Sequence, residues 1–228
     1  MARLKILHRD KDLVIIHKPS GMNTYNDEKG AAGLSAYDVL KKQFAEAKLH
    51  PVHRLDRGTD GLLIFALRPD VANLLTKMFR EEKVKKTYWA LVWGDPTARG
   101  EWKKPLSDKA GGATQRAQTK FRSRGRFETE ADAEGKTHKF TWLECEPKTG
   151  RYHQIRRHAA EAGYPIIGDP DYSTEALTEA SKIFGMKRIA LSSIRLEFMH
   201  PTLRKPVLIE TYPETTFGKI LRQLENSA

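Results

Sequence analysis

The chain has 228 residues, and 40 lysines and arginines against 29 acidic residues give it a net charge of +11 at pH 7. This length suits one sizeable domain or at most two small ones. Hydrophobic residues make up 39%, and no apolar run approaches the roughly 20 residues needed to span a bilayer. We therefore exclude a membrane protein and a disordered acidic tail. The basic balance favours a polyanionic partner.

The N-terminal residues and the cysteine content indicate in which cellular compartment the protein is found. The opening residues hold no apolar run followed by a small-residue cleavage site, so nothing predicts secretion. Cys145 is the single cysteine, which excludes an internal disulfide and a cysteine-based zinc site. We expect a soluble, cytoplasmic, globular protein.

The first part of the chain predicts strands and two helices. Residues 4–8 and 13–17 are short apolar segments around a charged turn, as in paired strands. Residues 35–48 carry a partial apolar stripe at helical spacing, and residues 62–67 form an apolar run typical of a buried strand. The clearest helix begins at Pro69, where apolar residues recur at helical spacing behind a proline suited to a first helical position.

The middle of the chain changes in composition. Residues 88–93 predict a strand, and residues 95–139 are then rich in glycine and basic residues but poor in large apolar ones. We interpret residues 95–139 as a peripheral excursion with weak strands, because they hold too little apolar material for a core of their own. Two further strands and three helices are expected at residues 140–145 and 194–198, and at 154–162, 175–184 and 216–224. The irregular alternation predicts α+β or mixed α/β.

Several catalytic motifs are absent. The sequence contains no Gly-x-Ser-x-Gly elbow, no phosphate-binding loop and no dinucleotide fingerprint. His50 and His53 flank a proline and have no obvious third ligand, so we do not predict a metal site. The stretch from His53 to Asp56 differs from the His-Arg-Asp loop of kinases, and the other kinase motifs are missing.

Three polar stretches could carry chemistry. Residues 53–61 precede the buried strand, and sites are often built at such element ends; the alternative is a surface turn with a weak ion pair. Residues 148–158 hold four basic residues, two histidines and no acid, and a helix starting there would attract anions; the alternative is a solvated basic face. Tyr88 ends the stretch Lys85-Lys86-Thr87-Tyr88 and opens a strand, and the alternative there is a core tyrosine.

Together these stretches predict a cleft with a carboxylate, a partner arginine, an aromatic platform and a basic rim. Such a combination holds single unstacked nucleotides. A carboxylate near an arginine stays ionised, so Asp56 could be a nucleophile or a base. The residues alone leave the reaction open.

At these residues the sequence resembles the RluA-type family of RNA pseudouridine synthases. The family motif His-Arg-Leu-Asp-x-x-Thr-x-Gly-Leu-Leu corresponds to residues 53–63, and Thr-Gly-Arg-x-His-Gln-Ile-Arg to residues 149–156. The Lys-Pro-x-Gly and Lys-x-Tyr elements are residues 18–21 and 86–88. Residues 168–172 and 200–201 extend the resemblance, which covers residues 4–212 in order.

The resemblance implies an α+β fold, with a mixed, mostly antiparallel β-sheet flanked by helices and a central catalytic cleft. It implies one catalytic domain over residues 1–228, with the excursion at 95–139 inside it and no separate N-terminal RNA-binding domain. The implied activity isomerises uridine in RNA to pseudouridine without a metal or organic cofactor. The protein is expected to act as a monomer with no obligatory protein partner.

The resemblance also assigns roles to residues. Asp56 would be the essential carboxylate, which attacks either the sugar or the uracil ring. Arg156 would pair with it, and Tyr88 would stack on the base and accept its proton from carbon 5. Arg54 would fill the gap left by the flipped nucleotide, and Ile155 would form an apolar floor. The further substrate-binding residues would be His53, Arg151, His153, Lys18 and Lys86.

Some positions differ from the usual pattern of the family. Asp60 stands in place of a usual Ser, and because like charges repel we expect its side chain to point away from Asp56. Ser192 stands in place of a usual His, and Leu203 and Arg204 replace Thr-Gly. These departures bear on the RNA target.

The target and the activity each have an alternative. The lack of an N-terminal RNA-binding domain, together with residues 146–151, is similar to the short, tRNA-acting TruC-type members and favours tRNA, with rRNA as the alternative. A catalytically silent RNA-binding module or RNA chaperone of the same fold is the second class of function. The joint presence of Asp56, Tyr88 and Arg156 favours the enzyme.

Overall fold

The computed structural model describes residues 3–26, 34–44, 48–108, 111–130, 135, 137–186, 188–214 and 216–226. The chain divides into two compact units: the first holds Met1–Lys86 and Ser193–Pro213, and the second holds Thr87–Ser192 and Glu214–Ala228. Within the described ranges, no helix has both the length and the apolar content needed to cross a lipid bilayer. A single catalytic domain that includes both units stays a prediction.

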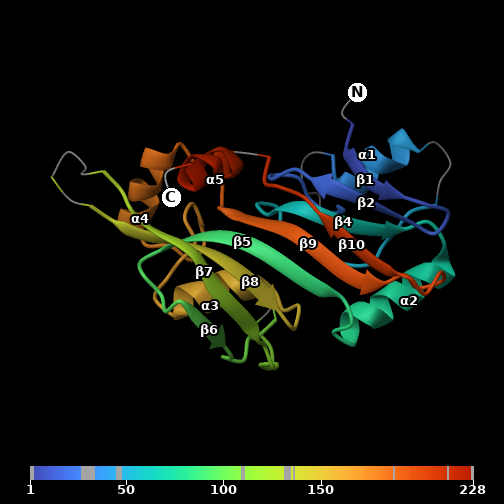
Figure 1. Ribbon diagram of the computed structural model, residues 1–228. Helices are drawn as coiled ribbons and strands as arrows, with labels where there is room; N and C mark the ends of the chain where they lie inside the picture. The colour runs from blue at the N-terminus through green and yellow to red at the C-terminus, as the bar shows by residue number, and fades with distance from the viewer. Residues whose placement is uncertain are drawn as a thin grey trace. The chain divides into compact units, whose positions relative to one another are not determined.

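Figure 1 shows the elements in chain order. They are β1 (Lys5–Arg9), β2 (Leu13–Lys18), α1 (Ala36–Gln43), β3 (His50–Pro51), β4 (Asp60–Ala66), α2 (Pro69–Arg80), β5 (Lys85–Trp93), β6 (Arg99–Trp102), β7 (Thr119–Glu128), β8 (Lys139–Pro147), α3 (Gln154–Glu161), α4 (Glu175–Ala180), the 3-10 helix η1 (Ser181–Phe184), β9 (Leu191–Met199), β10 (Pro206–Glu210) and α5 (Thr216–Asn226).

The first unit is built on antiparallel strands. β2 pairs with β1 on one side and with β4 on the other, β3 also pairs with β4, and β10 pairs with β9. β4 and β9 are neighbours in strand order. At Gly61, φ is +108°, and an added Cβ would lie 2.2 Å from the carbonyl oxygen of Ser193. Only glycine permits this backbone conformation and this close approach.

Both faces of β4 are covered by helices, which explains its continuous apolar sequence. Leu62 and Ile64 share one core with Val71 of α2. Phe65 points to the other face, where its ring lies 6.5 Å from that of Tyr37 in α1. Since successive strand residues alternate between faces, α1 and α2 lie on opposite sides of these strands, as Figure 1 shows. The predicted sheet flanked by helices is confirmed.

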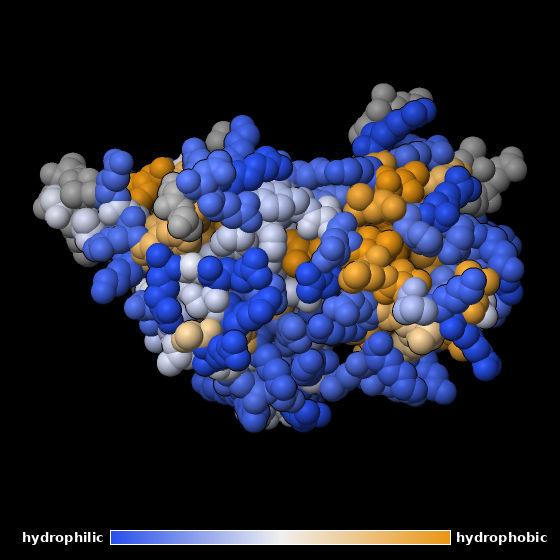
Figure 2. Space-filling view, in the orientation of Figure 1, coloured by the Kyte–Doolittle hydropathy of each residue, from blue (hydrophilic) through white to orange (hydrophobic). Residues whose placement is uncertain are grey.

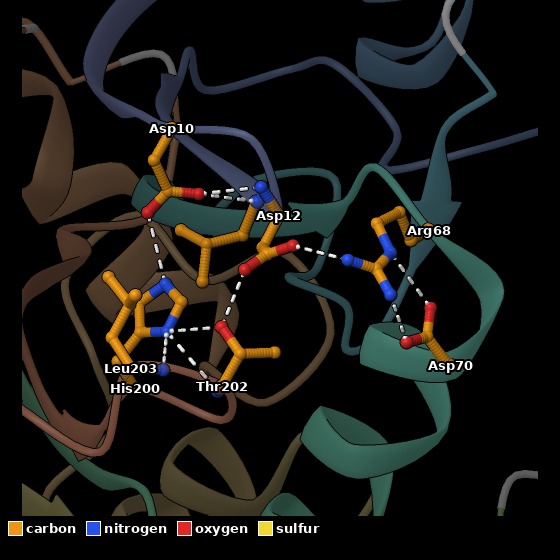
Figure 3. A network of polar contacts seen from close by, with 8 residues as sticks. Asp10, Asp12, Arg68, Asp70, His200, Thr202 and Leu203 are labelled. Carbon is orange, nitrogen blue, oxygen red and sulfur yellow. Dashed lines mark hydrogen bonds and ion pairs between the residues drawn. The ribbon is translucent and has the colours of Figure 1, made fainter.

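A hydrogen-bonded network closes the turn between β1 and β2 (Figure 3). One carboxylate oxygen of Asp10 accepts two main-chain N–H groups of the turn, and the other lies 3.0 Å from Nε2 of His200. Asp12 is fully buried; it accepts hydrogen bonds from Arg68 at 3.2 Å and from Thr202 at 2.5 Å. Burial opposes ionisation of Asp10, but hydrogen bonds from the main chain of Asp12 and Leu13 and from the side chains of His8 and His200 outweigh it and lower the pKa of Asp10 to about 2.

The same network contains the one group in the described ranges that could hold a metal ion. Ligand atoms of Asp10, Asp12 and His200 lie within 4.8 Å of one another. Their carboxylate oxygens already accept hydrogen bonds from the protein, and Nδ1 of His200 lies 3.2 Å from the main-chain nitrogen of Leu203. The network therefore clamps the β1–β2 turn without needing an ion.

The second unit contains the strand order β5-β8-β7-β6, with each pair antiparallel. α3 lies against β7 and β8. Nδ1 of His158 lies 2.9 Å from Oγ1 of Thr119 in β7, and its Nε2 lies 2.9 Å from the carbonyl oxygen of Lys104. Buried polar groups thus fix the helix on the sheet.

The described residues of the segment 95–139 contain longer strands than the weak ones that the sequence predicted. It contains β6 and β7, and β7 pairs with β8 from Thr119 to Glu128. The alternation of buried Thr119 and Phe121 with exposed basic residues is a strand pattern. The composition of the segment does not show this pattern, because half of the strand residues are polar. Lys109, one of the basic residues of this segment, lies outside the described residues.

Most predicted elements are confirmed, with differences at their ends. α1 ends at Gln43, and the residues 45–47 of the predicted helix lie outside the described ranges. Its capping box at Ser35 fixes the start, since Ser35 accepts from the N–H of Asp38. β3 and β10 were not predicted; the former has only two residues, and the latter starts with a proline. Figure 2 shows apolar residues gathered over β1 and β10, where Ile6 and Leu208 are exposed.

Candidate active site

Asp56 begins a tight turn directly before β4. Its carbonyl oxygen accepts the N–H of Thr59 at 3.1 Å, which closes a four-residue turn. The Asp56 side chain is half-exposed, whereas Leu55 before it and Thr59 after it are buried. The turn therefore presents a carboxylate from between two buried anchors.

The Lys-Pro-Ser-Gly segment holds this turn from the side. The N–H of Gly21 donates to the carbonyl of Arg57 at 2.6 Å, and Nε of Arg57 donates back to the carbonyl of Gly21 at 3.1 Å. Oγ of Ser20 donates to the carbonyl of Gly58 at 2.5 Å. Gly21 has φ of +89°, which side chains disfavour. Hydrogen bonds thus join the motif at residues 18–21 to the motif at residues 53–63.

A further hydrogen-bond pair fixes the start of the turn. Oγ1 of Thr24 accepts the N–H of Leu55 at 3.1 Å and donates to the Leu55 carbonyl at 3.2 Å. Arg54, directly before Leu55, is exposed, and its guanidinium carbon lies 5.6 Å from the centre of the Tyr25 ring. The predicted role of Arg54 in place of the flipped nucleotide stays a prediction.

Lys18 supports the same framework from inside. Its side chain is fully buried, and Nζ donates to the carbonyls of Pro19 at 3.1 Å and Met22 at 2.8 Å. The ammonium group neutralises carbonyl dipoles of the segment that carries Gly21. The structure thus gives Lys18 a supporting position, and its predicted contact with substrate stays a prediction.

His53 is a half-buried structural acceptor. Its Nε2 accepts the N–H of Ile64 in β4 at 3.0 Å, and its ring stacks on Phe79 of α2 with centres 4.5 Å apart. Burial, assisted by the positive charge of Lys86, lowers the pKa of His53 to about 3. His53 is therefore neutral at physiological pH and ties the turn to β4 and α2. Its predicted contact with substrate, like that of Lys86, stays a prediction.

In the second unit, Arg156 is the most constrained of the predicted residues. It is buried on α3, where Nε donates to Asp169 at 2.8 Å and Nη2 donates to Asp169 and Asp171 at 2.6 Å each. Its Nη1 lies 3.0 Å from both ring nitrogens of His153, and its guanidinium carbon lies 5.0 Å from the centre of the Tyr172 ring. These contacts set the guanidinium in one orientation.

The other predicted residues of α3 differ in exposure. His153 precedes the helix in the left-handed conformation, with φ of +50°. Ile155 is buried, as an apolar floor requires. Arg151 is exposed, and its Nε donates to the carbonyl of Arg116 at 3.1 Å.

Tyr88 lies on β5 directly opposite Cys145 of β8. Its side chain is half-buried. Cys145 is fully buried, and burial together with the nearby charge of Glu144 raises the pKa of its thiol well above the usual range. The thiol is therefore not a nucleophile.

Comparisons with known proteins identify these motifs. Residues 12–161 match the family model of RNA pseudouridylate synthase. The chain belongs to this family. The tRNA pseudouridine synthase C of Haemophilus ducreyi is 36% identical over 96% of this chain and 95% of its own length. The ribosomal large subunit pseudouridine synthase C of Buchnera aphidicola is 32% identical over 96% of this chain and 70% of its own length.

A solved structure agrees with the family assignment. Human RNA Pseudouridylate Synthase Domain Containing 4 matches with a TM-score of 0.74 and 26% identity, over 97% of this chain and 93% of that one. The protein is an RNA pseudouridine synthase, and it isomerises uridine in RNA. The α+β fold expected from the resemblance is confirmed.

Basic side chains form an exposed face on β7. Lys120, Arg122, Arg124 and Arg126 are exposed at alternate positions of this strand. Glu144 lies below them, 2.8 Å from Nε of Arg122 and 3.7 Å from Nη1 of Arg124. Burial raises the pKa of Glu144, but the hydrogen bond and charge of Arg122 outweigh it and lower the pKa. The buried carboxylate of Glu144 thus holds Arg122 and Arg124 in place, whereas Arg126 pairs with Asp95.

Sequence reasoning missed the residues that support the predicted ones. Asp169 received no role, although it binds Arg156 with both carboxylate oxygens. Thr24 lies outside the family motifs used here and still fixes Leu55. The one signal for Asp169 was its place in the Gly-Asp-Pro-Asp-Tyr element at residues 168–172, since an aspartate there is a candidate partner for a nearby basic helix.

Proposed function

We propose that this synthase modifies uridine in tRNA and that Asp56 is its essential carboxylate. The observation that carries the role of Asp56 is the turn itself. Ser20, Gly21 and Thr24 fix its main chain, and the Asp56 side chain stays half-exposed. A fixed main chain that carries a partly exposed aspartate is an arrangement that suits a nucleophile.

The reaction is an isomerisation, so its atoms balance within the nucleotide. The bond from carbon 1′ of the ribose to nitrogen 1 of uracil breaks, the base turns, and carbon 5 bonds to carbon 1′. The hydrogen of carbon 5 leaves as a proton, and nitrogen 1 gains one. Asp56 attacks either the sugar or the ring in this scheme and is released at the end, so no cofactor is consumed.

We further propose roles for the remaining residues on the basis of the family motifs. Arg156 pairs with the reacting carboxylate, and its hold by Asp169 supports this because it presets the guanidinium. Tyr88 stacks on the uracil and accepts the proton of carbon 5. Arg54, which is exposed, takes the place of the flipped nucleotide and lowers the unstacking cost.

The choice of tRNA rests on the relatives. The Haemophilus ducreyi protein, which covers nearly the same length, is named for tRNA, whereas the Buchnera aphidicola protein is named for the ribosomal large subunit. The name of the Buchnera aphidicola protein makes rRNA the alternative target. We propose that the protein works as a monomer in the cytoplasm, where it meets mature tRNA.

The experiment measures tritium release from uridine labelled at carbon 5, with bulk tRNA and rRNA from cells that lack the gene as separate substrates. Release from tRNA alone supports the proposal. Release from rRNA alone would show that the target is rRNA and not tRNA, and the enzymatic activity would stand. Release from neither RNA, with binding to both retained, would favour the catalytically silent RNA-binding module.

A further inference from the structure

A buried histidine faces a buried carboxylate at the end of the Asp56 turn. His17 lies in β2, and Asp60 is the first residue of β4, directly after Thr59. Nε2 of His17 lies 3.5 Å from Oδ2 of Asp60, and the two side chains are 1% and 3% exposed. Within the described residues, neither of these two atoms makes a hydrogen bond.

Such a pair contributes little to the stability of the fold. Burial of polar groups is unfavourable unless short, well-oriented hydrogen bonds replace those to water. A buried ion pair is often no more stabilising than apolar side chains of similar volume. Since 3.5 Å is long for a hydrogen bond, this contact adds little to the free energy of folding, and its value lies in the geometry that it sets.

The location of the pair points to another role. In the β2–β4 ladder His17 is opposite Leu62, and Asp60 lies on the same face as Leu62, so that His17 and Asp60 are diagonal neighbours. His17 directly precedes Lys18, which holds the segment that carries Gly21. The contact between His17 and Asp60 therefore joins the two segments that support Asp56.

A third segment orients the histidine. Nδ1 of His17 lies 2.9 Å from Oγ1 of Thr211. The N–H of Thr211 donates to the carbonyl of Ile194 in β9 at 2.9 Å. One ring nitrogen is thus anchored by Thr211, and the other is aimed at Asp60.

We propose that Thr211, His17 and Asp60 are positioning residues for Asp56. These three residues, called the relay below, set where β4 begins relative to β2. The start of β4 in turn fixes Thr59, the residue that closes the Asp56 turn. The proposal rests on the proposed function of Asp56. Because small displacements of a reacting group greatly reduce rates, loss of the relay lowers kcat and leaves the affinity for RNA unchanged.

The test uses steady-state tritium release with the full-length protein, at a temperature where circular dichroism shows each variant folded. Asp60→Ala and His17→Leu are each expected to lower kcat about tenfold at unchanged KM. Asp60→Asn keeps an oxygen acceptor and is expected within about twofold of the wild type. The double variant His17→Leu/Asp60→Ala is expected to be no slower than either single one, because the residues act as one unit.

Two further variants keep the test decisive. Thr211→Val preserves volume, removes the hydroxyl group and is expected to lower kcat about threefold even if Asp60→Ala fails to fold. Asp10→Asn is the matched control, since it alters another aspartate–histidine contact, with His200, at the other end of β2; its kcat is expected to equal that of the wild type.

The outcomes separate this proposal from the proposed function. An inactive wild type would overturn the proposed function itself. An active wild type with unchanged kcat in folded Asp60→Ala, His17→Leu and Thr211→Val would overturn the relay. A rise in KM alone, or losses that multiply in the double variant, would also overturn it.

Discussion

Gly21 and Arg57 exchange two hydrogen bonds, one from the N–H of Gly21 to the Arg57 carbonyl at 2.6 Å and one from Nε of Arg57 to the Gly21 carbonyl at 3.1 Å. This exchange makes the Lys-Pro-Ser-Gly segment a support for the Asp56 turn. Although the Lys-Pro-Ser-Gly segment and the Asp56 turn are far apart in the sequence, this contact brings them together.

Gly21→Ala is expected to lower both stability and kcat. Its φ of +89° would cost a side chain about 1–2 kcal/mol, and relaxation would shift the turn. The matched control is Gly163→Ala, which has φ of +85° with no atom within 4 Å of the added Cβ. Urea unfolding should show similar destabilisation of both variants, while tritium release should fall about tenfold in Gly21→Ala alone. Equal activity in both variants would contradict the support role.

His53 is expected to make the folded state less stable in mild acid. Burial holds its pKa at about 3, below the unfolded value of about 6.5. The unfolded state therefore binds more protons between these two values, and stability falls as pH falls through this window by up to about 1.4 kcal/mol per pH unit.

The measurement is urea unfolding at pH 7.5 and pH 5.0. The wild type should lose about 2 kcal/mol more than His53→Gln, which keeps an acceptor for Ile64 but does not titrate. Identical losses in the two proteins would show that His53 is not buried as a neutral ring.

The sequence predicted the elements better than the contacts between them. The helix at Pro69 and the strand at residues 62–67 follow from periodicity, because α2 and β4 bury regular apolar patterns. The partners of Arg156 did not follow, since Asp169 meets it only through folding of the loop after α3. β7 was underestimated because its buried residues alternate with charges that dominate any composition count.

Asp169→Asn is expected to destabilise the protein by about 3–5 kcal/mol and to lower kcat. The reason is that Arg156 would stay buried without the carboxylate that binds two of its nitrogens. Asp171→Asn is the control; Asp171 contacts the same guanidinium, but its side chain is 55% exposed, so the loss should stay below about 1 kcal/mol. Thermal unfolding and tritium release measure both effects, and equal losses in the two variants would refute the distinction.

Reversal of the basic face of β7 is expected to weaken RNA binding. In the variant Lys120→Glu/Arg122→Glu/Arg124→Glu, the slope of log affinity against log salt should fall by about two to three, because fewer counterions are released. The control Lys77→Glu/Arg80→Glu/Lys83→Glu makes the same change in charge on exposed residues at the end of α2. If both variants change the slope equally, net charge and not β7 determines RNA binding.

The most direct measurement of the central claim compares Asp56→Asn with the wild type in single-turnover tritium release from uridine-labelled tRNA. Asn keeps the size and the turn of Asp56 but removes the carboxylate charge. We expect release to fall at least a thousandfold, with the affinity for tRNA and the thermal unfolding midpoint unchanged. Release from Asp56→Asn at the rate of the wild type would contradict the assignment of Asp56 as the essential carboxylate.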